Sequence, residues 1–183
     1  MKVINLFGGP GSGKSTTAAG LFYKMKMDGI NVELVTEYAK ELAYDGTLEL
    51  MLDRQEVIFA EQNQRLHRLR DKVDFAIIDS PLLLSHIYPE MNQQQRGVNG
   101  WPALEAFQQL VLAVIDTYDN KNIFLNRAAD FQEYGREHSL DESREIDQAI
   151  KATLMRHNLP TNAYIVDENV VHEILKNEIM PLI

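Results

Sequence analysis

Residues 8–15 read Gly8-Gly9-Pro10-Gly11-Ser12-Gly13-Lys14-Ser15 and decide the fold of this chain, because they match the pattern G-x-x-x-x-G-K-[ST]. The glycines of this pattern let the backbone wrap around an anion and point its N–H groups at phosphate oxygens. Lys14 would reach the β- and γ-phosphates of a nucleotide, and the Ser15 hydroxyl would ligate Mg²⁺. The stretch therefore predicts a phosphate-binding P-loop. The predicted nucleotide-binding residues here are Gly8, Gly9, Pro10, Gly11, Ser12, Gly13, Lys14, Ser15 and Thr16.

The sequence on either side of the loop is what a P-loop requires. The apolar, β-branched run 3–7 precedes it and predicts a short buried strand, and residues 15–27 suit a helix. Strand, glycine loop and helix in this order form the unit in which the motif occurs, and the helix N-terminus adds partial positive charge at the phosphates. The context favours a functional P-loop over a glycine-rich turn with an accidental lysine.

Strands and helices alternate along the rest of the chain. Apolar runs predict four further strands at 31–35, 74–79, 122–125 and 163–166. Helices are expected over 53–70, 103–118, 139–157 and 167–177. Five short strands separated by helices predict an α/β protein whose mostly parallel sheet is covered on both faces.

Polar residues mark the expected starts of three of these helices. Asp53 with Glu56, and Ser139 with Glu142, have the spacing of a capping box, in which the two side chains satisfy each other's backbone N–H groups. Asp167 is expected to cap the last helix.

Two polar stretches are expected to be loops. Residues 86–102 are rich in Gln, Asn, Gly and Pro and contain Trp101; residues 127–141 contain Arg127 and Arg136. Both follow strands, on the side of the sheet where α/β proteins bind ligands. We expect 127–141 to be a functional lid, and 86–102 to be either an acceptor-side insertion or a solvated connection.

Length, charge and composition limit the class of protein. The 183 residues are most simply one domain, 1–183. No apolar run approaches a membrane span, and the chain enters a strand at once, so we expect no membrane partner and no signal peptide. The absence of cysteine excludes disulfides and fits a reducing, cytoplasmic location. A net charge of −9 repels nucleic acid on average, although a local basic patch could still bind it.

Two carboxylates follow strands at positions that a phosphoryl-transfer site needs. Asp79 ends the strand 74–79, where it would hold Mg²⁺ directly or through water, a role compatible with capping a helix. Glu37 follows the strand 31–35 and would orient an acceptor hydroxyl and take its proton. An ordinary first-turn glutamate is the equal alternative for Glu37, and Glu41 is a lesser candidate for the same role.

Three arginines bracket the stretch 127–141. Arginines on a closing lid neutralise the negative charge that spreads over the transferred phosphoryl group. Arg136 is the first candidate for this role and Arg144 the second, whereas Arg127 could stack on adenine. The alternative is that all three are surface arginines paired with acidic neighbours.

The helix 53–70 carries polar residues with two possible roles. Gln55, Gln62 and Arg65 could line an acceptor pocket or form an exposed face. The basic residues between Arg54 and Lys72 could bind a phosphorylated or polymeric acceptor, or be a solvated surface.

With these residues in place, the chain resembles small P-loop kinases of the nucleoside and nucleotide kinase group. It is most similar to the ribosylnicotinamide-kinase-like domain of bacterial NAD-biosynthesis regulators and to small phage-encoded P-loop kinases or ATPases. The resemblance covers nearly the whole chain and rests on the P-loop, Glu37-Tyr38, Asp79, and Gly135-Arg136 with Arg144. It implies a three-layer P-loop NTPase sandwich whose five-stranded parallel sheet has the order 2-3-1-4-5, with a lid over ATP.

The resemblance also implies an activity. It predicts an ATP- and Mg²⁺-dependent kinase, monomeric or homodimeric, that transfers the γ-phosphoryl group to a hydroxyl of a nucleoside, nucleotide or related base-containing acceptor. The expected catalytic residues are Lys14, Glu37, Asp79, Arg136 and Arg144, with Ser15 and Asp79 for the metal and Arg127 for the nucleotide.

Two other functions stay open. The acidic-Arg pair usual after the third strand is here Asp79-Ser80, which leaves the acceptor undefined. A phage-type kinase acting on 5-hydroxymethyluracil in DNA shares the general design. An ATP-binding regulatory switch with slow hydrolysis is the alternative outside the kinases.

Overall fold

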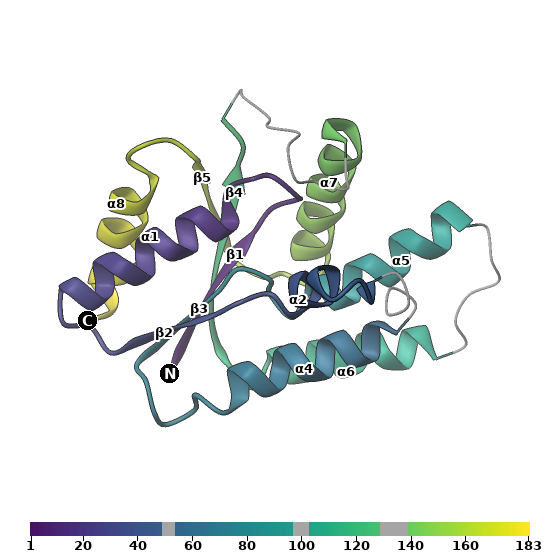
Figure 1. Cartoon of the computed structure of the whole chain (residues 1–183), viewed down its shortest axis with the longest axis horizontal. Coiled ribbons are helices and arrows are strands. Elements are labelled where there is room, and N and C mark those ends of the chain that lie inside the picture. The colour runs from purple at the N-terminus through teal and green to yellow at the C-terminus, as the bar shows by residue number, and fades with distance from the viewer. Residues whose placement is uncertain (49–53, 97–102, 129–138) are drawn as a thin grey trace.

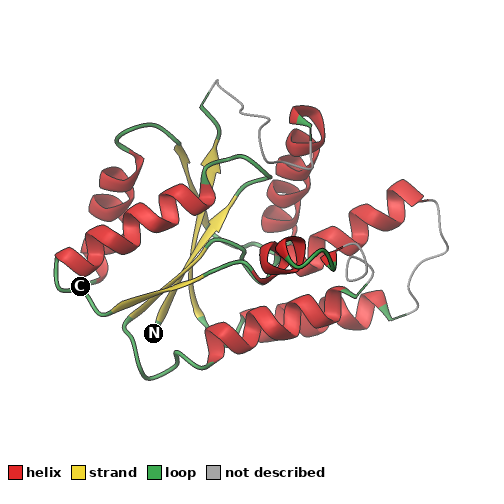
Figure 2. Cartoon of the chain, in the orientation of Figure 1, coloured by secondary structure: helices red, strands yellow, loops and turns green. Residues whose placement is uncertain are grey.

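The computed structural model describes residues 1–48, 54–96, 103–128 and 139–183, and shows one sheet with helices on both faces (Figures 1 and 2). The strands are β1 (Lys2–Phe7), β2 (Val32–Val35), β3 (Phe75–Ile78), β4 (Asp119–Asn126) and β5 (Thr161–Ile165). All pairs are parallel, and the order is β2-β3-β1-β4-β5. The predicted α/β class and strand order are confirmed.

The parallel register brings one end of every strand to the same edge of the sheet. Phe7 of β1 pairs with Phe124 of β4, and Val35 of β2 pairs with Ile78 of β3. The segments that follow the strands at this edge are residues 8–13, 36–37, 79–81 and 127–128. Polar groups that are far apart in the chain therefore meet at the P-loop.

The helices form two layers. They are α1 (Lys14–Met27), α2 (Tyr38–Tyr44), α4 (Gln55–His67), α5 (Leu84–Arg96), α6 (Leu104–Ile115), α7 (Leu140–Arg156) and α8 (Val170–Ile174). A π-helical turn (Leu175–Ile179) and a 3₁₀ turn (Met180–Leu182) follow α8. Figure 1 shows α1 and α8 on one side of the sheet and α4 to α7 on the other. None of the helices in the described ranges is long and apolar enough to cross a membrane.

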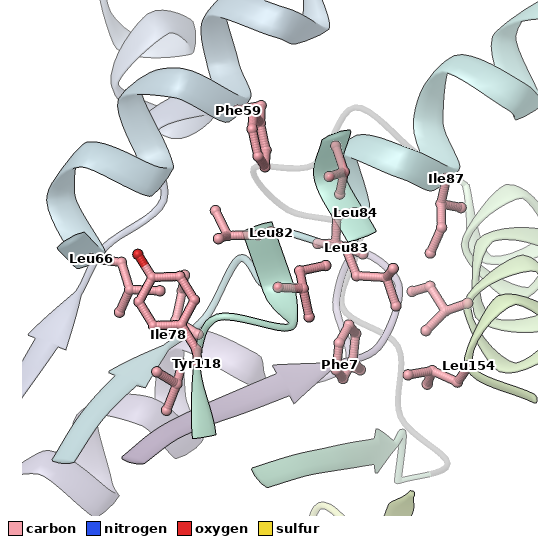
Figure 3. Packing of buried hydrophobic residues seen from close by; sticks show 14 of the residues in the cluster. Phe7, Phe59, Leu66, Ile78, Leu82, Leu83, Leu84, Ile87, Tyr118 and Leu154 are labelled. Carbon is pink, nitrogen blue, oxygen red and sulfur yellow. The ribbon is translucent and has the colours of Figure 1, made fainter. Parts of the chain in front are cut away.

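Each face of the sheet has its own apolar core, because successive side chains of a strand point to opposite faces. On β1, Ile4 and Leu6 pack against α1 and α8, whereas Phe7 packs against the helices of the other layer. Figure 3 shows this second core, which gathers Phe7 of β1, Ile87 of α5 and Leu154 of α7 in one cluster. Burial of such a side chain stabilises the folded state by roughly 1.5–3 kcal/mol.

Helix α5 corrects the prediction of a loop over 86–102, at least as far as Arg96. Its apolar residues Leu84, Ile87, Tyr88 and Met91 have helical spacing and pack on the core. The gain from burying this face exceeds the cost of Pro89, which removes one backbone hydrogen bond inside the helix. Residues 97–102, including Trp101, lie outside the described residues, as do 129–138 of the expected lid.

The expected capping box at α7 forms, and the start of α4 differs from the prediction in the described residues. Ser139 accepts a hydrogen bond from the N–H of Glu142 (3.3 Å) and donates its own N–H to the Glu142 carboxylate (2.7 Å). The predicted N-cap of α4 is wrong, because the residue before the helix is Arg54, and Glu56 pairs with the Arg54 guanidinium at 2.7 Å. Asp53 lies outside the described residues.

The last helix begins later than expected. Asn169, not Asp167, is the residue before α8, and the Asp167 carboxylate accepts the N–H of Asn169 at 2.8 Å. Asp167 thus stabilises the turn that enters the helix instead of capping its first turn.

Candidate active site

The P-loop backbone depends on glycine at two positions in particular. Gly8 (φ 146°) and Gly13 (φ 85°) have dihedral angles that other residues rarely adopt. A Cβ atom on Gly8 would lie 2.4 Å from Ser12 Oγ, and one on Gly13 would lie 2.8 Å from a methyl group of Val166. The turn at Gly13 starts α1, so Lys14 and Ser15 occupy the positive end of the helix dipole.

Lys14 folds back onto the loop. Its ammonium group donates hydrogen bonds to the carbonyl oxygens of Gly8 (2.7 Å) and Gly9 (3.0 Å). Burial lowers the pKa of Lys14, whereas the nearby carboxylates of Glu37 and Asp79 favour its charged form. The lysine is thus held among acidic groups at the mouth of the loop.

Ser15 and Asp79 meet as a metal site requires. The Ser15 hydroxyl donates a hydrogen bond of 2.8 Å to Oδ2 of Asp79. Asp79 is buried, and its Oδ1 has no hydrogen-bond partner among the described residues. An unpartnered buried carboxylate oxygen is costly in a folded protein unless a ligand binds it. Hydroxyl and carboxylate oxygens are ligands that Mg²⁺ prefers, so this donor set fits the ion.

Glu37 lies between the end of β2 and the start of α2. Burial raises its pKa, and the negative charge of Asp79 raises it further, whereas Lys14 and Lys40 act in the opposite direction. The same carboxylate also acts on the pKa of Lys14, so Glu37 belongs to the P-loop cluster. A raised pKa is typical of a carboxylate that exchanges protons.

Arg127 is held by the P-loop and α7. Its guanidinium donates to the Pro10 carbonyl (3.1 Å) and the Ser143 hydroxyl (2.6 Å) and forms an ion pair with Asp147. Its side chain is 11% exposed. Stacking of Arg127 on adenine stays a prediction, and the contacts seen here are with protein groups.

A family model described as an AAA domain matches residues 3–170, which include the P-loop and the strands of the sheet. This chain belongs to that family. No curated protein sequence matches it closely enough to count as a relative.

Solved structures show proteins with a fold similar to that of this AAA domain protein. The deoxyadenosine kinase of M. mycoides with bound dCTP has a TM-score of 0.66 at 18% identity, over 97% of this chain and 98% of that one. The same kinase with bound dATP has a TM-score of 0.63 at 18% identity, over 96% and 98%. The NadR protein in complex with NR has a TM-score of 0.71 at 15% identity over 96% of this chain, which spans about half (51%) of NadR. These similarities confirm the fold, which this chain shares with the M. mycoides deoxyadenosine kinase and with NadR.

Three predicted site residues remain, namely Arg144, Thr16 and Arg136. Arg144 is 61% exposed and pairs with Asp141 on the same helix at 3.1 Å, as the surface alternative predicts. Thr16 is exposed in the first turn of α1. Arg136 lies outside the described residues. The catalytic roles of the two arginines stay predictions.

Two polar residues of α4 lie inside the protein, and one of them holds the backbone around Glu37. Gln55 and Gln62 are buried. The Gln62 amide accepts the N–H of Tyr38 (2.9 Å) and donates to the carbonyl of Thr36 (3.2 Å), the residues on either side of Glu37. The exposed-face interpretation is therefore wrong for both glutamines.

Two arginines of the basic segment are bound to other parts of the protein. Arg65 binds both carboxylate oxygens of Glu41, at 2.6 and 2.5 Å. Arg70 lies over the ring of Tyr118 and donates to the hydroxyl of Thr117.

Two further residues near the cluster were not identified as site residues from the sequence. Asp147 contacts the P-loop from α7, but nothing in its neighbourhood along the chain distinguishes it from other acidic residues of that helix. Tyr88 comes from α5, where burial raises the pKa of its hydroxyl and the carboxylates of Glu37 and Asp147 raise it further. The helical spacing of apolar residues in α5 was the signal that could have placed Tyr88 in a buried helix.

Proposed function

We propose that this protein is an ATP- and Mg²⁺-dependent kinase that transfers the γ-phosphoryl group to a hydroxyl of a nucleoside, nucleotide or related base-containing acceptor. The observation that carries the proposal is the gathering of Lys14, Glu37 and Asp79 at the P-loop. A cation for phosphate, a carboxylate for the metal and a second carboxylate with a raised pKa are the groups that such a transfer needs.

Each residue has a distinct task in the transfer. The loop backbone and Lys14 bind the phosphates, while the oxygens of Ser15 and Asp79 would hold Mg²⁺, which would offset negative charge on the phosphates. Glu37 accepts the proton of the acceptor hydroxyl as its oxygen bonds to the γ-phosphorus. The bond from that phosphorus to the bridging β–γ oxygen breaks, and ADP leaves with the electron pair.

The nature of the acceptor is supported by the solved structures of similar fold. The M. mycoides enzyme is a deoxyadenosine kinase seen with bound dCTP and dATP, and NadR is seen with NR. The burial of Glu37 and its raised pKa support a kinase over a regulatory switch, because a kinase needs a group that takes the proton of the acceptor hydroxyl.

The test is transfer of label from γ-labelled ATP with Mg²⁺ to a panel of acceptors. The panel holds nucleosides, nucleoside monophosphates, nicotinamide riboside, and DNA with and without hydroxymethylated pyrimidines. We expect label on a base-containing small molecule and none with Lys14→Ala. Lys24→Ala is the matched control, because Lys24 is exposed on the same helix and pairs only weakly with Asp28 (3.8 Å).

Other outcomes would contradict the proposal in specific ways. Label found only as free phosphate would favour the regulatory switch. Label on DNA, with an affinity that falls steeply as salt rises, would favour the DNA kinase, because a polyanionic acceptor releases counterions on binding.

A further inference from the structure

Asp147 of α7 joins two groups that lie far apart in the sequence. Its Oδ1 accepts the backbone N–H of Gly9 in the P-loop at 2.6 Å. Its Oδ2 forms the ion pair with Arg127, which follows β4. Both side chains are largely shielded, with 16% of Asp147 and 11% of Arg127 exposed. A charge-assisted hydrogen bond in such surroundings is stronger than one at the surface.

The next residue of the loop is held by the same elements. The carbonyl of Pro10 accepts hydrogen bonds from the Arg127 guanidinium (3.1 Å) and from the Ser143 hydroxyl of α7. Arg127 also donates to the Ser143 hydroxyl at 2.6 Å. The Gly9–Pro10 segment is thus held through a backbone donor, the Gly9 N–H, and through a backbone acceptor, the Pro10 carbonyl.

Gly9 supplies independent evidence for this close contact. Unlike Gly8, Gly11 and Gly13, it has no positive φ angle, so its backbone conformation does not require glycine. A Cβ atom at Gly9 would lie 2.5 Å from the Ser143 carbonyl and 2.8 Å from the Arg127 guanidinium. Glycine is needed here because α7 and the loop approach each other so closely.

We propose that Asp147 is a positioning residue, which holds the Gly9–Pro10 segment against α7 and thereby sets the affinity of the P-loop for nucleotide phosphates. The inference rests on the proposed function, since it assumes that the loop binds ATP. Arg127 keeps the Asp147 carboxylate neutralised near the phosphate site. A loop ordered in advance loses less conformational freedom when its ligand binds.

The test compares Asp147→Asn with Glu145→Gln, which removes an exposed carboxylate from the same helix. In Asp147→Asn we expect faster hydrogen–deuterium exchange of the P-loop peptide in the nucleotide-free protein. We also expect the Kd for MgATP, measured by calorimetry, to rise about tenfold, the typical effect of losing one charge-assisted hydrogen bond. Glu145→Gln should match the wild type in both measurements.

A second variant keeps the test decisive if Asp147→Asn folds poorly. Ser143→Ala removes only the hydroxyl that binds the Pro10 carbonyl, and it should raise P-loop exchange and the Kd for MgATP in the same direction. A lower melting temperature with unchanged exchange and unchanged Kd would overturn the inference, because Asp147 would then be a structural tie alone. If the wild type failed to bind MgATP, the proposed function would fail, and exchange in the free protein would still decide whether Asp147 orders the loop.

Discussion

At the scale of single residues, the burial of Glu37 changes the pH range in which its carboxylate is ionised. A carboxylate takes a proton only in its ionised form, and burial raises the pKa of Glu37 above its ordinary value of 4.5. Deprotonated Glu37 is therefore lost at a higher pH than an exposed glutamate would be. The surrounding positive charges of Lys14 and Lys40 limit this shift.

We predict that phosphoryl transfer falls as the pH drops through this raised pKa. Glu37→Gln should remove that limb from the profile of kcat/KM against pH and reduce kcat by roughly 10²–10⁴-fold, with little change in MgATP affinity. Glu41→Gln should keep the wild-type profile, because Glu41 is exposed and bound to Arg65. Unchanged kcat in Glu37→Gln would exclude Glu37 as the base.

At the scale of elements, contacts between α4 and the start of α2 hold the backbone around Glu37. Gln62 of α4 binds the backbone on both sides of Glu37, so the backbone that carries Glu37 depends on a helix that begins 18 residues later in the chain. Arg65 adds a bidentate ion pair to Glu41 on the same pair of helices.

We predict that Gln62→Leu lowers kcat more than it changes the KM for ATP. The substitution leaves the Tyr38 N–H and the Thr36 carbonyl without their partner and should also cost about 1–3 kcal/mol of stability. Steady-state kinetics and urea unfolding measure the two effects. Gln64→Leu, at an exposed position of the same helix, is the control. Equal losses in both variants would show that Gln62 has no specific role.

Two helices, α7 and α5, show when a local sequence pattern predicts the structure correctly and when it does not. The box at Ser139 was predicted correctly because its two partners are three residues apart in the chain and interact within the first turn of the helix that they cap. Pro89 and the amide-rich run in α5 indicated a loop, but burial of the Leu84 and Ile87 face decided for a helix. Tertiary packing overrides composition when an apolar face is available.

At the scale of the whole molecule, Glu178 ties the end of the chain to the sheet. Its buried carboxylate accepts hydrogen bonds from Asn162 (2.8 Å) and Tyr164 of β5 and pairs with Lys121 of β4 (2.5 Å). Burial alone would raise the pKa of Glu178, but these three partners outweigh it and lower the pKa. The π-helical turn that carries Glu178 is thus bound to β4 and β5, the two strands at this edge of the sheet.

We predict that this network stabilises the fold above the ordinary glutamate pKa of 4.5 and is lost as the pH falls through the lowered value. Acid lowers the stability because a group whose pKa is lower in the folded state binds protons more readily in the unfolded state. Glu178→Gln should cost about 1–3 kcal/mol at pH 7 and flatten the loss of stability below pH ~4.5, as measured by urea unfolding. Glu168→Gln, at an exposed position, should behave as the wild type, and identical acid profiles for all three proteins would refute the role.

The sequence alone determined the fold class and the centre of the candidate site. The P-loop is contiguous, so its chemistry depends on neighbouring residues and on glycine conformation, and Asp79 and Glu37 could be placed because parallel strands end at one edge. Only the tertiary structure decided that Gln62 brackets Glu37, that α5 is a helix, and that Asp147 binds Gly9 across 138 positions of the chain. Such contacts arise when packed layers bring distant side chains together, and no local pattern encodes which polar groups then meet.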